Sequence, residues 1–246
     1  MYFEHHHIIA LNELESTNNY ARQLVSDKAE DGTVVLAQFQ SGGRGQQGNS
    51  WESEAGKNLL FSLILYPVFM EAELQFYLSM IVSLALVDVL DEETEPVHIK
   101  WPNDIYVGNR KIAGILIENS VKGSKLDGTI VGIGLNLNQE IFISDAPNPV
   151  SLKQLTKNDY DISKVLQHFL ETFGSLYQLL KMRRYNEIEQ AYLNRLFGKG
   201  EWRTYRAKNK EFEAKITGIG EYGKLHLENR SGKILEFMFK EVEFVL

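Results

Sequence analysis

The 246-residue chain contains no cysteine. It can therefore form neither a disulfide nor a thiolate-ligated metal site, which suits a reducing compartment such as the cytoplasm. The histidine run at residues 5–7 is left without a cysteine or acidic partner near it in the sequence. Two imidazoles on one face of a strand rarely make a metal site by themselves, so we predict none there.

Basic side chains are in deficit. Lys and Arg number 26 against 33 Asp and Glu, which gives a formal net charge of -7. Proteins that hold the phosphate backbone of DNA or RNA need basic stripes on their surface. The balance of charge therefore argues against a nucleic-acid-binding role.

Long hydrophobic runs are also scarce. Residues 1–17 have no basic flank followed by a long apolar stretch, so no signal peptide is predicted. The most apolar segment, residues 74–90, contains Gln75 and Asp88 and is shorter than the ~20 apolar residues that cross a bilayer. We interpret it as a buried core helix and expect a cytoplasmic protein with no membrane association.

What remains is an ordinary globular composition, 43% hydrophobic and 24% charged. Strand patterns occupy residues 33–39, 59–66 and 129–138, a two-stranded hairpin fits 97–118, and helical patterns occupy 17–27 and 161–196. After Gly198, short alternating segments separated by glycine turns indicate a small barrel of about five strands. We therefore predict an α+β fold, with a mixed sheet backed by helices in residues 1–197 and a small β-barrel domain in residues 198–246.

The segment SGGRGQQGNSW, residues 41–51, is rich in glycine and polar. Such a loop can wrap its backbone N–H groups around an anion, with Arg44 adding positive charge. It is not a Walker loop, because no Gly-Lys-Ser/Thr follows. A plain connection between two strands would have a similar composition, so both interpretations stay open here.

The segment KWPNDIYVGNRKIAGILIE, residues 100–118, concentrates polar side chains in one hairpin. Pro102 interrupts the strand ladder, and a bend there would project Asn103 and Asp104 out of the sheet. Lys111 opens an otherwise apolar strand, where its charge must meet an anion or lose hydration at a cost. The alternative is that Lys111 is a surface lysine that extends into solvent.

The strand GIGLN, residues 132–136, has glycines where a side chain would obstruct a neighbour or a ligand. Asn136 and Asn138 fall on one face of that strand. Buried asparagines need hydrogen-bond partners, such as a base, a ribose or a metal-bound phosphate. A purely structural asparagine near a turn is the other interpretation.

Together these segments resemble the signatures of the biotin protein ligase family. They read GRGQQGNSW at 43–51, KWPNDI at 100–105, RKIAGILIE at 110–118 and GIGLN at 132–136, in the order of the family, with STN at 16–18 and FQ at 39–40 besides. The resemblance covers nearly the whole chain, and KWPND followed by RKIAGIL is its most specific part. It implies a class II synthetase-like catalytic domain, an SH3-like C-terminal barrel, and the monofunctional form without an N-terminal DNA-binding domain.

The resemblance also implies the activity. Such an enzyme joins biotin to ATP to make biotinyl-5′-AMP and pyrophosphate, then passes the biotinyl group to one lysine of a biotin carboxyl carrier domain. Biotin and ATP are the expected small molecules, with Mg²⁺ bridging the phosphates. The expected partner is the carrier domain of a biotin-dependent carboxylase, and a monomer and a homodimer are both compatible with an exposed edge strand.

Site residues follow from the same resemblance. Polar side chains are expected to hold the ureido ring of biotin, a glycine-lined slot its valeryl chain, and Trp51 to cover adenine. The biotin-binding set is Ser16, Thr17, Asn18, Gln40, Arg44, Gly45, Gln46, Lys111 and Gly114. The ATP-binding set is Arg44, Gln46, Trp51, Asn58, Lys100, Asn103, Lys111 and Asn136.

Three residues, Lys111, Arg44 and Asp104, are expected to act in catalysis. A carboxylate and an α-phosphate repel each other, so Lys111 and Arg44 should supply positive charge between them. The acceptor lysine, with an ordinary pKa of about 10.4, must be neutral to react. Asp104 could orient it or take its proton, or could simply hold the KWPND bend. The glycine-rich loop should close over the adenylate, which water would destroy, with Trp51 as its apolar anchor.

The sequence departs from the family at Gln46, Gln47 and Asn49, where arginine is usual. Charge-assisted bonds to phosphate are about twice as strong as neutral ones. We therefore expect weaker nucleotide affinity or a faster loss of the intermediate.

Three other functions are weighed against the ligase. A lipoate or octanoate ligase would share the fold, but the STN and Gln40 positions favour biotin. A non-catalytic sensor of biotin or biotinyl-AMP would fit the missing loop charges, but Lys111, Asp104 and Arg44 are all present. An interaction module in the C-terminal barrel could coexist with catalysis.

Overall fold

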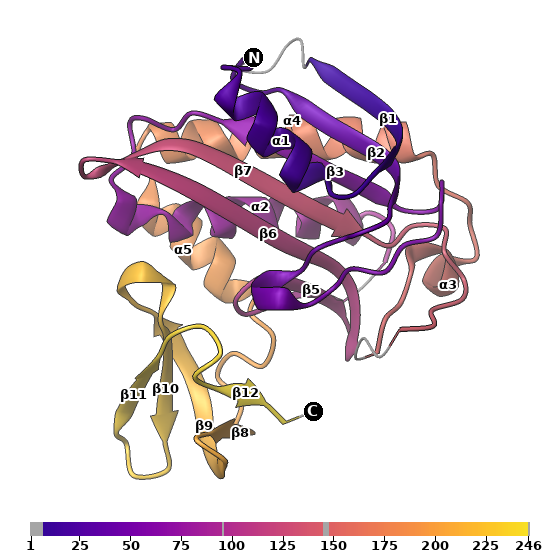
Figure 1. The fold of residues 1–246 in the computed structure, drawn as a ribbon. Coiled ribbons are helices and arrows are strands. Elements are labelled where there is room, and N and C mark those ends of the chain that lie inside the picture. The colour runs from indigo at the N-terminus through magenta and orange to yellow at the C-terminus, as the bar shows by residue number, and fades with distance from the viewer. Residues whose placement is uncertain (1–6, 95, 145–147, 246) are drawn as a thin grey trace.

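The computed structural model describes residues 7–94, 96–144 and 148–245. A seven-stranded sheet runs in the order β1-β2-β3-β7-β6-β5-β4 (Figure 1). Only the β1–β2 pair is parallel among its strand pairs, and the other neighbours are antiparallel, so this sheet is mixed, as predicted. Its strands are β1 (Ile8–Leu14), β2 (Val34–Gln40), β3 (Leu59–Leu65), β4 (Val97–Lys100), β5 (Asp104–Val107), β6 (Arg110–Lys122) and β7 (Lys125–Leu135).

Helices cover both faces of this sheet. Figure 1 shows α1 (Thr17–Ser26) on one face, and α2 (Phe76–Asp91), α4 (Ile162–Lys181) and α5 (Tyr185–Asn194) on the other. Both groups bury apolar side chains. Ala21 of α1 packs against Val35, Ile64 and Ile130 of the sheet, and α1 also buries the polar Thr17 and Asn18. The face of the sheet under α1 carries the site described below.

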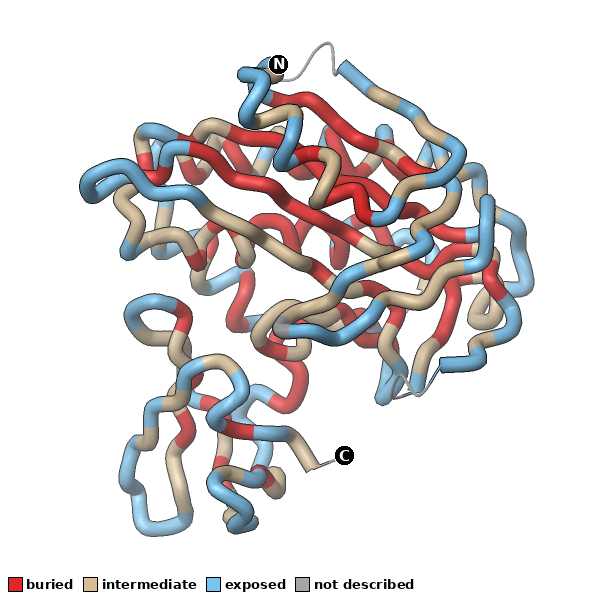
Figure 2. Tube along the Cα trace, viewed as in Figure 1, coloured by how far each residue is buried: buried red, intermediate tan, exposed pale blue. Residues whose placement is uncertain are grey.

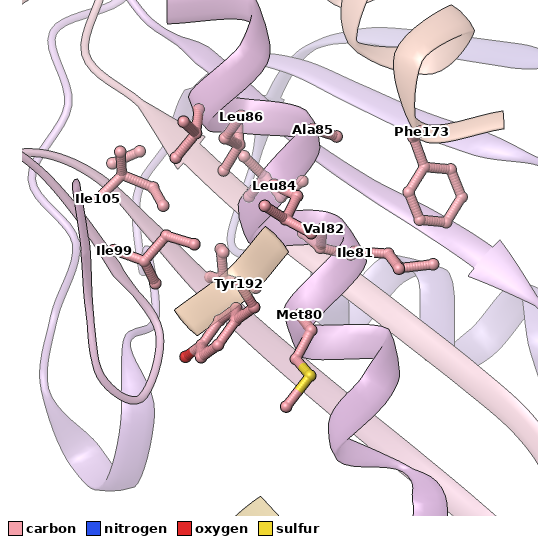
Figure 3. Packing of buried hydrophobic residues seen from close by; sticks show 14 of the residues in the cluster. Met80, Ile81, Val82, Leu84, Ala85, Leu86, Ile99, Ile105, Phe173 and Tyr192 are labelled. Carbon is pink, nitrogen blue, oxygen red and sulfur yellow. The ribbon is translucent and has the colours of Figure 1, made fainter. Parts of the chain in front are cut away.

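Helix α2 is the centre of the core. The segment Ala72–Asp91 is long and apolar enough to cross a membrane, but 67% of its most apolar window is buried inside the protein. Figure 3 shows Ile81 near Phe173 on one side, and Ile99, Ile105 and Tyr192 on the other, and Figure 2 shows the same helix as a buried stretch. The core helix predicted at 74–90 is confirmed, and burying each large side chain there contributes about 1.5–3 kcal/mol.

The C-terminal residues form a second, antiparallel sheet of five strands in the order β11-β10-β9-β8-β12. This confirms the small all-β unit predicted after Gly198, while the domain boundary at that residue stays a prediction. The indole N–H of Trp101 donates to the Gly223 carbonyl at 2.9 Å and so links the two sheets. The strands are β8 (Arg203–Ala207), β9 (Lys210–Ile219), β10 (Leu225–Asn229), β11 (Ile234–Phe237) and β12 (Glu243–Phe244).

One local prediction was wrong and one helix was missed. The hairpin expected over 97–118 is three strands, β4, β5 and β6, because the segment around Pro102 turns the chain before β5 begins. The short helix α3 (Leu152–Thr156) was not predicted, although Ser151 and Gln154 form a complete capping box.

Candidate active site

A cavity of about 780 Å³ lies among the face of the main sheet under α1, the glycine-rich loop and residues 239–244 of the C-terminal unit. Binding sites for ligands of this size are commonly concave and mostly preformed. The structure brings most of the predicted residues together here. Those that line the cavity are Ser16, Thr17, Asn18, Gln40, Arg44, Gly45, Gln46, Trp51, Lys100, Asn103, Asp104, Lys111 and Gly114.

Glycines form the floor of the cavity on β6 and β7. Gly114 pairs with Gly134 across the two strands. A Cβ atom on Gly114 would lie 2.9 Å from Cζ3 of Trp51, and one on Gly134 would collide with the same ring. A Cβ atom on Gly132 would likewise collide with the side chain of Asn18. The close approach predicted for this strand is present, and the groups that approach it in this structure are Trp51 and Asn18.

Lys111 and Asp104 form an ion pair, with Nζ 2.7 Å from Oδ1. Both side chains are about one quarter exposed, 24% and 23%. Strand pairing places Asp104 opposite Gly114, and a register shift follows between Ile105 and Tyr106. The Lys111 ammonium also lies 5.6 Å from the centre of the Trp51 ring, within the range of a cation–π contact. The lysine that enters an apolar strand therefore meets an anion, as predicted.

Arg44 lines the same cavity as Lys111. Its guanidinium donates to Asn19 Oδ1 at 2.8 Å and lies 3.5 Å from Glu118 Oε1. Glu118 also accepts from Asn18 Nδ2 at 2.8 Å. Sequence reasoning did not single out Glu118, although it ends the RKIAGILIE motif, and this position was the available signal.

A buried polar network borders the cavity at the start of α1. Gln40 Oε1 accepts from the backbone N–H of Thr17 at 2.7 Å and from its hydroxyl at 3.1 Å. Ser62 Oγ lies 2.8 Å from the Thr17 hydroxyl oxygen and 2.6 Å from Asn18 Oδ1, within hydrogen-bond distance of both. Ser16 stands at the N-cap of α1 but makes no side-chain capping bond. Ser62 was missed, and its signal was a serine inside the apolar run LLFSLILY.

Lys100 lies where the C-terminal unit meets the sheet. Its Nζ is 3.3 Å from the Tyr106 hydroxyl and 5.4 Å from the centre of the Phe244 ring. Burial lowers the pKa of Lys100, with Asp104 opposing that shift and Lys111 adding to it. Residues of the C-terminal unit thus form part of the cavity wall.

Two predicted residues lie outside the lining. Asn58 donates to Gln139 Oε1 at 2.5 Å and accepts from the backbone N–H of Leu137 at 3.1 Å. Asn136 donates to the Val150 carbonyl at 3.1 Å. Both side chains hold neighbouring segments in place, and the structure does not bring them into the cavity. Their contact with ATP remains a prediction without geometric support.

No group of three or more His, Cys, Asp or Glu side chains suited to a metal ion occurs within residues 7–94, 96–144 and 148–245. His5 and His6 of the histidine run lie outside the described residues. Mg²⁺ is commonly held by one or two carboxylates together with phosphate oxygens of a substrate. In the cavity Asp104 and Glu243 offer carboxylates, so the residues present fit a magnesium ion that arrives with a nucleotide.

Comparison with known proteins follows the same lines. The model of the Biotin/lipoate A/B protein ligase family matches residues 11–136. The chain is 32% identical over 234 residues to the bifunctional ligase/repressor BirA of Bacillus subtilis (strain 168), covering 92% of this chain and 70% of that one. It is 31% identical over 229 residues to the biotin–acetyl-CoA-carboxylase ligase of Paracoccus denitrificans, covering 89% and 93%.

A solved structure of the biotin protein ligase from Aquifex aeolicus in complex with biotin and ATP has the same fold. It superposes with a TM-score of 0.81 at 28% identity, covering 97% of this chain and 99% of that one. The sequence matches and the shared architecture agree with the motifs and with the cavity that they build. This chain belongs to the Biotin/lipoate A/B protein ligase family.

Proposed function

We propose that this chain is an ATP-dependent biotin protein ligase, which forms biotinyl-5′-AMP and then biotinylates one lysine of a biotin carboxyl carrier domain. The observation that carries the proposal is a single cavity that brings a buried polar network together with the cations Arg44 and Lys111. Relatives and a structural neighbour that carry the name of biotin protein ligase support it.

In the first step the biotin carboxylate attacks the α-phosphorus of ATP. A carbon–oxygen–phosphorus bridge forms, the bond to the β-phosphate oxygen breaks, and pyrophosphate leaves. Both reactants are anionic, so preorganised positive charge lowers the barrier. Lys111 and Arg44 supply it from the protein, and Mg²⁺, when bound with ATP, neutralises charge on the phosphates. An entering anion would compete with Asp104 for Lys111 and with Glu118 for Arg44.

In the second step the acceptor amine attacks the carbonyl carbon of the adenylate and AMP leaves. The amine must first lose a proton, because a lysine with a pKa of about 10.4 is almost wholly protonated at neutral pH. Asp104 is the carboxylate beside Lys111 in the cavity. It is placed to receive or orient the incoming ammonium once the phosphate has drawn Lys111 away.

The glycine-rich loop is proposed to shield the adenylate from water. Its two arms are joined by the bridge between Arg44 and Ser50 and by the bond from the backbone N–H of Trp51 to the Gly43 carbonyl at 2.9 Å. We therefore expect the two arms to move together. Trp51 brings an apolar surface against the floor of the cavity at Gly114 and Gly134.

The polar network at the cavity favours biotin over lipoate or octanoate. Thr17, Gln40, Ser62 and Asn18 form a buried hydrogen-bonded network. A ureido ring offers donors and an acceptor that can join such a network. A dithiolane ring or an alkyl chain offers neither, and each polar atom of this region that lost a water molecule to it without a replacement hydrogen bond would cost about 1–3 kcal/mol.

The reaction is proposed to take place in the cytoplasm on the carrier domain of a carboxylase. The purified chain, incubated with Mg-ATP, should release pyrophosphate when biotin is added. Lipoate and octanoate should give no more than the background release. Equal release with octanoate would overturn the assignment to biotin, and no release with any acid would overturn the ligase assignment.

A further inference from the structure

A second hydrogen-bonded cluster lies beside the cavity and takes no part in the chemistry described above. Its centre is Gln139, which follows β7 and is 1% exposed. Gln139 Oε1 accepts from the backbone N–H of Glu54 at 3.0 Å and from Asn58 Nδ2 at 2.5 Å. Its Nε2 donates to Glu52 Oε1 at 3.4 Å. One buried amide thus ties three positions of the glycine-rich loop's C-terminal stem to the end of β7.

Glu52 extends the cluster with both of its carboxylate oxygens. Oε1 accepts from the backbone N–H of Ile143 at 2.8 Å, and Oε2 accepts from that of Ser144 at 2.9 Å. Burial alone would raise the pKa of Glu52, but the hydrogen bonds from Ser144, Ile143 and Gln139 lower it below its ordinary value. The group is therefore a carboxylate at neutral pH, and its bonds to the N–H groups are charge-assisted.

Position along the chain links this cluster to the active site. Trp51 immediately precedes Glu52, and its indole lies against Gly114 with its centre 5.6 Å from Lys111 Nζ. Trp51 and Glu52 are joined by one peptide bond, and both carboxylate oxygens of Glu52 are held by hydrogen bonds. The freedom of Trp51 to leave the cavity floor is limited by whatever holds Glu52.

We propose that Glu52 and Gln139 are positioning residues, a clamp that fastens the glycine-rich loop to the segment after β7 and so keeps Trp51 over Lys111. Glu52 and Gln139 touch no substrate in this account. The inference rests on the proposed function, because the purpose of the Glu52–Gln139 clamp is to keep the adenylate in the cavity. The clamp matters more in a loop that carries Gln46 and Asn49 than in one that carries arginines there. Neutral side chains add little attraction for a phosphate, so they contribute little to holding the adenylate.

The matched variants are Glu52→Gln and Glu54→Gln. Each removes one negative charge from the same stretch of loop. The amide of Glu52→Gln keeps the shape of the side chain but turns an NH₂ group toward one of the two N–H donors. The side chain of Glu54 is exposed and accepts no hydrogen bond among the described residues, so Glu54→Gln controls for charge alone.

The first measurement is backbone hydrogen exchange in the ligand-free protein. It reports how often the hydrogen bonds of the clamp open and does not depend on enzyme activity. Residues 139–144 should exchange about tenfold faster in Glu52→Gln, because each lost bond to a charged group shifts the opening equilibrium by roughly that factor. Glu54→Gln should exchange like the wild type. Equal protection in all three proteins would overturn the clamp.

The second measurement is the rate at which preformed biotinyl-5′-AMP dissociates from the enzyme. Glu52→Gln should lose it about tenfold faster than Glu54→Gln, at an unchanged rate of transfer from bound adenylate and an unchanged midpoint of thermal unfolding. Equal dissociation rates, or a uniform loss of every step with a lowered unfolding midpoint, would overturn the positioning role. A wild-type enzyme that forms no adenylate would contradict the proposed function. The hydrogen-exchange measurement would still test the clamp in that case, because it needs no activity.

Discussion

Lys111 Nζ lies 2.7 Å from Asp104 Oδ1, on neighbouring strands that meet at the edge of the active-site cavity. The cation assigned to the first step and the carboxylate assigned to the second thus neutralise each other before substrates bind. We expect an α-phosphate that enters the cavity to replace Asp104 as the partner of Lys111. On this proposal Asp104 is released at the stage when the acceptor amine arrives.

Asp104→Asn separates the two roles considered for this residue. The amide can hold the bend and accept a hydrogen bond, but it cannot take a proton. We expect single-turnover transfer to the carrier lysine to fall by about 10²–10⁴-fold, the range of general base catalysis, with a smaller change in adenylate formation. Rapid-quench measurements of both steps decide the matter. Equal losses in the two steps would assign Asp104 to holding the bend.

Gln46→Arg restores a cation to the glycine-rich loop at a position that lines the cavity. A bond from a charged donor to phosphate is stronger than one from an amide by about 1 kcal/mol, so the adenylate should dissociate roughly fivefold more slowly. The dissociation rate of preformed biotinyl-5′-AMP measures this directly. An unchanged rate would show that the missing charge does not limit retention.

Gly134→Ala tests the contact between the loop and the cavity floor. The added methyl group would collide with the Trp51 indole, and overpacking of this kind costs about 1–3 kcal/mol. The affinity for biotinyl-5′-AMP should fall, because the loop can no longer close on the sheet. Gly218→Ala is the matched control in another strand, where the added methyl group would lie 4.0 Å from His226 Nδ1, an ordinary van der Waals contact. Equal affinity for biotinyl-5′-AMP in both variants would contradict the proposed packing of Trp51 against Gly134.

The pH dependence of adenylate formation should depend on Lys100. Burial lowers the pKa of Lys100 below its ordinary 10.5, with Asp104 opposing and Lys111 adding to the shift. The positive charge is therefore present at low pH and is lost as pH rises through that lowered value. Lys100→Arg, which stays charged, should move the alkaline limb of the rate profile to higher pH. An alkaline limb at the same pH in both proteins would mean that Lys100 does not set it.

The sequence predicts the elements with strong local signals. The mixed sheet, the core helix α2 and the five C-terminal strands all follow from periodicity and turn residues. The bend at Pro102 was predicted, but the segment was assigned two strands instead of three, because a proline on an edge strand and a proline in a tight turn have the same local signature. Helix α3 was missed because five residues carry too little periodicity, although the capping pair Ser151 and Gln154 was visible.

The candidate site divides in the same way. Residues inside motifs, such as Lys111 and Asp104, could be assembled from the sequence. Ser62, Glu118 and Gln139 act through partners 44, 100 and 81 positions away, namely Asn18 for the first two and Asn58 for the third. Such contacts depend on sheet order and on the path of the loop, which no local pattern encodes.

The most direct test of the central claim is the intact mass of a biotin carboxyl carrier domain after incubation with this protein, biotin and Mg-ATP. The account predicts a gain equal to one biotinyl group on a single lysine. With Lys111→Ala, folded as judged by circular dichroism, the rate of that gain should fall by at least about 10²-fold, as expected when a group that stabilises transition-state charge is removed. A carrier domain that gains no mass with the wild type, or gains it equally fast with Lys111→Ala, would contradict the account.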